Sequence, residues 1–160
     1  MKHLTENEWP YNLPVWRNSW RSESPDGKFT AEISEALEVS MGNPTSGTLI
    51  LSSGITIEKC NPSFIWSDDS VYLAVPQYSF SWLWGIGKQR LLIIDVNKNI
   101  GWQSRKIAYY IQPEKFRGGK LTLTLNPFRK AKTMIYSIPK DLGTFTKMTL
   151  PPNKAMQGTP

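Results

Sequence analysis

Few side chains in this sequence are of the types that carry out catalysis. Its 160 residues include one histidine, His3, and one cysteine, Cys60. A Ser-His-Asp or Cys-His arrangement needs a histidine that the fold holds in place, whereas His3 stands in an N-terminal stretch that we expect to be frayed. Zinc sites use several cysteines or histidines, and the sequence has no CxxC or histidine pair. Residues 85–88 (GIGK) lack the Ser or Thr of a phosphate-binding loop. The sequence therefore predicts a protein that is not an enzyme and uses no metal or cofactor.

Carboxylates are the remaining candidates for chemistry. Asp68 and Asp69 fall in a turn, where aspartate is favoured because it bonds to nearby backbone groups. Glu32, Glu35 and Glu38 follow one another at a spacing of three residues. They have two interpretations: the solvated edge of a strand, or an acidic surface that contacts a basic protein. A carboxylate-dependent hydrolase would need two acids facing one cleft, which sequence spacing does not establish.

An aromatic segment is the best candidate for a binding site. Residues 78–85 read YSFSWLWG, and two cationic residues follow shortly afterwards. Tryptophan, tyrosine and arginine are enriched among the residues that contribute most to binding energy at interfaces. We therefore predict a partner contact made by Phe80, Trp82, Trp84, Lys88 and Arg90. The alternative is that the two tryptophans fold back and cover an open sheet.

The charge is divided unevenly along the chain, whose net charge is +6. Residues 1–80 hold five Lys and Arg against ten Asp and Glu, whereas residues 81–160 hold fourteen against three. Such an asymmetry is typical of a protein that meets an oppositely charged partner, although solvated charges spread over several faces would give the same count. The pairs Arg105-Lys106 and Tyr109-Tyr110 combine cations with aromatics, as nucleic-acid-binding surfaces do. No sequence pattern of a known nucleic-acid-binding module accompanies them.

The elements that must position these residues follow from a weak internal repeat with a period of 43 residues. Residues 24–31 (SPDGKFTA) are echoed by residues 67–74 (SDDSVYLA), and residues 49–51 (LIL) by residues 92–94 (LII). A turn, an aromatic-bearing strand and a second aliphatic strand therefore recur in register. A period of about 40–45 residues with several strands in each unit is typical of propeller blades.

Alternating apolar residues, β-branched residues and turn residues predict the individual strands. The ranges are 15–20, 29–41, 48–52, 55–60, 63–66, 71–75, 90–96, 101–109, 121–125, 133–138 and 144–150. Residues 25–27 (PDG), 42–47 and 118–119 (GG) are predicted turns or loops. Pro76 predicts that its strand bends or lies at an edge.

The sequences SPDGKF (24–29) and WSDDSVYLAV (66–75) resemble the first strand, turn and second strand of WD-repeat and related propeller blades. The resemblance spans about residues 15–110, although the WD dipeptide that closes such a blade is absent. It implies an all-β fold: an incomplete β-propeller, or stacked twisted antiparallel sheets built from about three blade-like units. We expect a single domain over residues 1–150, with units at about 15–60, 61–108 and 109–150, followed by a tail at 151–160.

The sequence favours a small binding protein. No apolar leader begins it and no apolar stretch is long enough to span a membrane, so we expect a cytoplasmic protein that does not bind membranes. In type it resembles a bacterial immunity protein, which neutralises a cognate toxin domain by covering its active site. The contact would be either the aromatic segment with Lys88 and Arg90, or the acidic group Glu32, Glu35 and Glu38. The alternative is a nucleic-acid-binding module that uses the basic C-terminal half.

Overall fold

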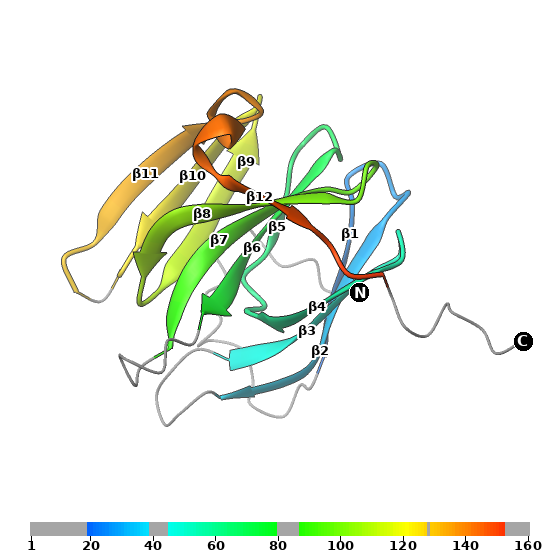
Figure 1. Cartoon of the computed structure of the whole chain (residues 1–160), viewed down its shortest axis with the longest axis horizontal. Coiled ribbons are helices and arrows are strands. Elements are labelled where there is room, and N and C mark those ends of the chain that lie inside the picture. Colours follow the sequence, from blue (N-terminus) through cyan, green and yellow to red (C-terminus); the bar gives the residue numbers. More distant parts are fainter. Residues whose placement is uncertain (1–18, 39–44, 80–86, 128, 153–160) are drawn as a thin grey trace, which may run out of the picture.

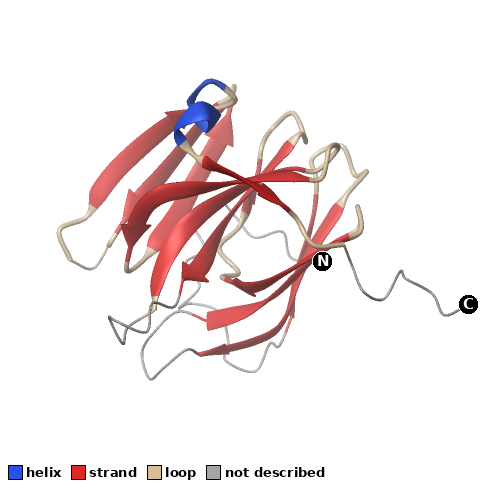
Figure 2. Cartoon of the chain, in the orientation of Figure 1, coloured by secondary structure: helices blue, strands red, loops and turns tan. Residues whose placement is uncertain are grey.

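The computed structural model describes residues 19–38, 45–79, 87–127 and 129–152, and nearly all of these residues lie in or between strands (Figure 1). Within the described residues there is no α-helix, and one short 3₁₀-helix, η2, spans Lys140–Thr144 (Figure 2). The first strands are β1 (Ser19–Glu23), β2 (Thr30–Glu38), β3 (Thr45–Leu51), β4 (Ile55–Cys60), β5 (Ile65–Trp66) and β6 (Tyr72–Ser79). The others are β7 (Lys88–Asp95), β8 (Ile100–Ala108), β9 (Ile111–Arg117), β10 (Lys120–Leu125), β11 (Lys132–Ser137) and β12 (Thr146–Thr149). The predicted all-β class is confirmed.

The strands form two antiparallel sheets. The larger has the order β1-β2-β3-β4-β6-β7-β8-β12, with β5 also paired to β6. Between β4 and β6 the pairing is limited to Cys60 opposite Gln77, so the sheet changes direction there. The smaller sheet has the order β11-β10-β9. Neither order returns to its first strand, and therefore neither sheet closes on itself.

Three layers of strands result, separated by two hydrophobic cores (Figure 1). The first core lies between β1–β4 and the strands β6 and β7, and the second lies between β6–β8 and the β9–β11 sheet. Strand β7 contributes to both cores because successive side chains point to opposite faces of a strand. Leu92 and Ile94 enter the first core, whereas Leu91 and Ile93 enter the second. The middle layer is thus buried on both faces, which explains its nearly continuous apolar sequence.

The sequence repeat corresponds to two turns with the same hydrogen bonds. In the turn between β1 and β2, Ser24 Oγ donates to Asp26 Oδ1 (2.7 Å) and accepts from the Phe29 N–H (3.0 Å). In the turn between β5 and β6, Ser67 Oγ donates to Asp69 Oδ1 (2.6 Å) and accepts from the Tyr72 N–H (2.8 Å). Each aspartate also accepts the backbone N–H two residues further on, at 3.1 Å in both turns. The same residue types at the same spacing therefore build the same local structure twice.

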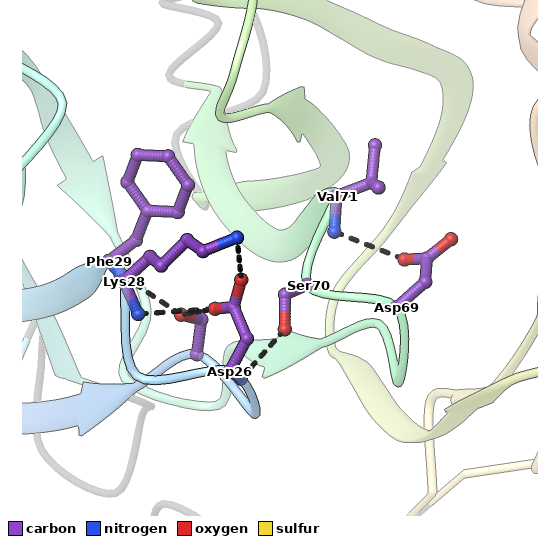
Figure 3. Close-up of polar contacts among 7 residues, drawn as sticks. Asp26, Lys28, Phe29, Asp69, Ser70 and Val71 are labelled. Carbon is purple, nitrogen blue, oxygen red and sulfur yellow. Dashed lines mark hydrogen bonds and ion pairs between the residues drawn. The ribbon is translucent and has the colours of Figure 1, made fainter.

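The two turns also contact each other (Figure 3). The Asp26 N–H donates to Ser70 Oγ at 3.0 Å. Ser70 occupies the position equivalent to Gly27, and both have the positive φ that this turn needs, 60° and 71°. The second turn continues the series, because Asp68 Oδ2 accepts the Gly118 N–H (2.9 Å) from the β9–β10 turn. One end of the three layers is therefore held together by turn-to-turn hydrogen bonds.

Several predicted boundaries differ from the structure. Residues 45–47 were predicted as loop but begin β3. Gly47 is needed there because a Cβ atom would lie 2.5 Å from the Ser34 carbonyl oxygen, at the bulge between β2 and β3. The first strand is described from Ser19 to Glu23 rather than over 15–20, and residues 15–18 lie outside the described residues.

Two further elements show how context changes a sequence pattern. Pro76 lies within β6, where its carbonyl accepts the Asn61 N–H (2.8 Å). The Pro76 nitrogen points to the same side of β6 as its carbonyl, at the place where β6 passes from pairing with β5 to pairing with β4. The missing N–H therefore removes no hydrogen bond between paired strands. Strand β9 has no predicted counterpart because a register shift opposite β10 adds Glu114 and breaks its alternation. Strand β12, within the third predicted unit, pairs with β8 of the second.

Candidate functional site

The candidate site lies on one face of β7 and β8, at the end of the sheet where β7 begins and β8 ends. Arg90 is registered with Ile107, and Gln89 with Ala108. Because side chains alternate along a strand, Lys88 and Arg90 share a face with Ile107 and Tyr109. Gln89 and Ala108 point the other way and are buried. We call the four residues Lys88, Arg90, Ile107 and Tyr109 the β7–β8 patch.

A bulge shapes this end of β8. The register shifts between Arg90 and Leu92, and buried Ser104 satisfies the backbone there. Its Oγ accepts the Leu91 N–H (3.0 Å) and donates to the Lys106 carbonyl (2.9 Å). The Arg90 guanidinium lies across the bulge and donates to the Ser104 carbonyl at 3.2 Å. Bulges often redirect side chains near functional sites, and this one presents residues 105–107 to solvent.

The patch combines cations with exposed apolar surface. Lys88 Nζ lies 5.3 Å from the centre of the Tyr109 ring, within the range of a cation–π interaction. Ile107 is 44% exposed and Tyr109 is 45% exposed. They are two of the four large hydrophobic side chains that are exposed among the described residues, with Leu37 and Ile135. Neighbouring exposed apolar and aromatic side chains are characteristic of contact surfaces.

The backbone that carries Tyr109 is held firmly. Asn126 Oδ1 accepts the N–H groups of both Tyr109 (3.0 Å) and Tyr110 (3.2 Å). Behind the patch, Gln89 Oε1 accepts the Ile111 N–H at 2.7 Å. The connection from β8 to β9 is therefore fixed from two sides, so that Tyr109 is presented from an ordered scaffold.

The predicted aromatic contact is only partly within the described structure. Lys88 and Arg90 lie in the patch, whereas Phe80, Trp82 and Trp84 lie outside the described residues. The flanking residue Ser79 is the registered partner of Lys88. The chain therefore leaves and rejoins the sheet beside the patch.

The predicted acidic group lies on the first layer. Glu32 is half-buried on the outer face of β2, because its neighbour Ile33 fills the first core. Glu35 is exposed at the β2 bulge with a φ of 54°, and Glu38 ends β2. The structure thus places Glu32 and Glu35 on a different layer from Lys88 and Arg90, so the two predicted contacts do not form one site.

The residues considered for catalysis have structural roles in the described part of the chain. Asp68 and Asp69 accept backbone N–H groups in the turns described above. Cys60 is buried in the first core, and its burial raises the pKa of the thiol, which keeps it protonated. Among the described residues, no cluster of three His, Cys, Asp or Glu could hold a metal ion. Likewise, no helix in the described ranges is long and apolar enough to cross a membrane.

Ile107 was missed by the sequence prediction, and Tyr109 was noted only for its basic neighbours. The sequence holds one short indication of them: three consecutive polar residues, Ser104, Arg105 and Lys106, interrupt the strand pattern just before Ile107. An interruption of this kind is consistent with a bulge, but the exposed face beyond it depends on the register with β7.

Comparison with known proteins found no matching family model, no matching curated protein and no matching solved structure.

Proposed function

We propose that this protein binds another protein through the β7–β8 patch and has no catalytic activity of its own. The observation that carries the proposal is the exposure of Ile107 and Tyr109 beside Lys88 and Arg90 on an ordered pair of strands. Aromatic and arginine side chains contribute most of the energy at protein interfaces, often about 2 kcal/mol or more each. The cations of the patch favour an acidic partner surface.

The type of partner that we propose is a toxin domain, which makes the protein an immunity protein. Binding at a rigid patch would cover the toxin's active site sterically, and this mechanism needs no catalytic group. A cytoplasmic location accompanies this proposal, because such an inhibitor protects the cell that makes the toxin. Support comes from the fold and the surface together: an all-β scaffold whose paired strands present the patch, and a basic half that carries it.

For the fold, we propose that the layers are blade-like units of an incomplete β-propeller. The two identical serine–aspartate turns support this proposal, since each precedes the long strand of its own layer. Strand β12 follows the third unit in the sequence but pairs with β8 of the second unit. The third unit therefore has the three described strands β9, β10 and β11.

The test is to capture proteins from a nuclease-treated native lysate with the tagged chain and with patch variants. We expect one stoichiometric protein, toxic when produced alone, whose affinity falls about tenfold or more with Ile107→Ser or Tyr109→Ala. The matched control is Leu37→Ser, which removes another exposed aliphatic side chain, 71% exposed, from the first layer. Equal capture of the partner by the original chain and by the three variants would contradict the proposed contact.

A nucleic-acid-binding function is the second candidate, and one observation favours it. The cation–π pair of Lys88 and Tyr109 also suits single-stranded nucleic acid, which binds to aromatic rings beside cations. Binding of that kind would weaken steeply with added salt and would be lost on nuclease treatment. Nucleic acid captured from an untreated lysate, with no protein left on the tagged chain after nuclease treatment, would replace the toxin-binding proposal with this one.

A further inference from the structure

Strand β11 forms an outer edge of the smaller sheet (Figure 1). Among the described strands its registered neighbour is β10, and its other side pairs with none of them. Natural edge strands are usually protected by charges, proline or short length. Edge strand β1 contains Arg21 and Glu23, and β12 is four residues long with Lys147. The other edge of the smaller sheet, β9, contains Pro113 and three charged residues. Residues 133–137 of β11 (TMIYS) contain no charge, proline or glycine, so this edge is the least protected of the four.

The outward backbone groups of β11 can be identified from its pairing. In an antiparallel pair, residues alternate between those bonded to the neighbouring strand and those whose N–H and C=O point away. The Ile138 N–H donates to the Gly119 carbonyl (2.7 Å), toward β10. The Ser137 N–H instead donates to Asp141 Oδ2 (2.7 Å). The alternation then directs the N–H and C=O of Thr133 and Ile135 outward, and no hydrogen bond to another described residue uses them.

We propose that β11 pairs with β11 of a second copy of this chain, in antiparallel register about Met134. This register places Thr133 of each copy opposite Ile135 of the other, so that the outward groups of the two residues satisfy one another with four hydrogen bonds. The β9–β11 sheets would join into one sheet of six strands. In each copy the Ser137 N–H already donates to Asp141 Oδ2. It is therefore not available to the second copy, and the pairing between the two strands ends at this residue on both sides.

Side chains and charges fit the same register. Ile135, which is 61% exposed, would lie beside Thr133 of the second copy on the outer face. Ser137 with its cap Asp141 would lie opposite Ala131, which stands between Lys130 and Lys132. The carboxylate of each copy would thus face two lysines of the other. The contact is small, so we expect a weak dimer that raised salt weakens further.

The first test is sedimentation equilibrium of the full chain, without any partner, over a range of concentrations. We expect dimerisation that Thr133→Pro weakens about tenfold or more, because two of the four hydrogen bonds lose their donors. The outward N–H is not used within the sheet, so proline is compatible with the fold at this position. Thr133→Val is the matched control, since it keeps the N–H and should dimerise as the original chain does.

The second test is disulfide cross-linking, which does not depend on the proline variant. The two Met134 residues face each other in the proposed register, so Met134→Cys should give a covalent dimer under mild oxidation. Thr133→Cys places the two sulfurs out of register and should cross-link far less. The native Cys60 is buried and gives a low background.

Three results would overturn the proposal. One is a monomer at every concentration with no Met134→Cys cross-link. Another is a dimer that Thr133→Pro leaves unchanged, which would place the contact on a different surface. The third is a monomer whose Thr133 and Ile135 amide protons are protected from exchange, which would mean that another part of the same chain covers the edge. Each result concerns the isolated chain and leaves the partner-binding proposal to its own experiment.

Discussion

At the scale of single residues, the serine–aspartate turns show how four side chains fix two connections. Ser24 and Ser67 are buried, and each hydroxyl both donates to an aspartate and accepts a backbone N–H. Removing such a hydroxyl leaves a partly buried N–H without its acceptor, and an unsatisfied group that is shielded from water is more costly than a lost exposed hydrogen bond.

We therefore predict that Ser24→Ala and Ser67→Ala each lower the free energy of unfolding by about 1–3 kcal/mol. The two changes should have similar effects, because the turns have the same bonds. Urea denaturation followed by circular dichroism measures both. Ser22→Ala is the control: its hydroxyl makes only a long 3.4 Å contact with the Glu23 carbonyl, and its loss should change stability by less than about 0.5 kcal/mol. A Ser24→Ala effect no larger than this control would contradict the assigned role.

Asp26 gives the first turn a dependence on pH. The hydrogen bond from Ser24, followed by that from the Lys28 N–H, lowers the pKa of Asp26 from 3.8 to about 2. A group whose pKa is lowered by folding contributes stability above its unfolded pKa and loses this contribution as the pH falls through its folded pKa. The stability advantage of the original chain over Asp26→Asn should therefore shrink as the pH falls from 5 to 2. Denaturation curves across this range measure it, and an advantage independent of pH would count against the lowered pKa.

At the scale of elements, the bulge between β2 and β3 depends on a glycine rather than on a loop. A Cβ atom at position 47 would lie 2.5 Å from the Ser34 carbonyl and 2.8 Å from Ile33 Cγ2. Both neighbours belong to β2, so the strands would have to separate.

Gly47→Ala should consequently lower the free energy of unfolding by about 1–3 kcal/mol, the usual effect of overpacking. Gly143→Ala is a matched control, because nothing lies within 4 Å of its added Cβ and little change is expected. Thermal or urea denaturation of the two variants makes the comparison, which fails if both glycines tolerate alanine equally.

The elements that the sequence predicted best are those with strong local signals. Alternation of leucine with threonine marks β10, and the turn residues mark the start of β2 and β6. Strand β9 was missed because a bulge, which is set by the partner strand, interrupts its alternation. The start of β3 was missed because Thr45, Ser46 and Gly47 are residue types that favour turns. Lys88 and Arg90 of the predicted contact lie in the β7–β8 patch, but their proximity to Ile107 and Tyr109 depends on the β7–β8 register, which the sequence does not give.

At the scale of the whole molecule, β7 joins the two cores. Leu92 is fully buried in the first core and Ile93 in the second, one residue apart. Neither core can lose its packing without disturbing the strand that serves the other.

We expect Leu92→Ala and Ile93→Ala each to lower the free energy of unfolding by about 2–5 kcal/mol and to retain a single transition. Circular dichroism and tryptophan fluorescence should report the same midpoint, since Trp20 and Trp66 line the first core and Trp102 packs against the second. Two separate midpoints for Ile93→Ala would show that the layers unfold independently.

The charge asymmetry is also a property of the whole molecule. The acidic residues Glu32 and Glu35 lie on the first layer, whereas the patch belongs to the basic half, which supplies β7 and β8 of the middle layer and all of the smaller sheet. An acidic partner would be attracted to the second of these regions. The proposed binding surface is therefore consistent with the long-range charge as well as with its own side chains.

The measurement that tests the partner-binding account most directly is backbone amide hydrogen exchange of the chain, alone and bound to its captured protein. We predict new protection at residues 88–90 and 105–110, while β2 with Glu32 and Glu35 remains unchanged. Protection centred on β2, with residues 88–90 and 105–110 exchanging as in the free chain, would contradict the account and would move the binding surface to the acidic first layer.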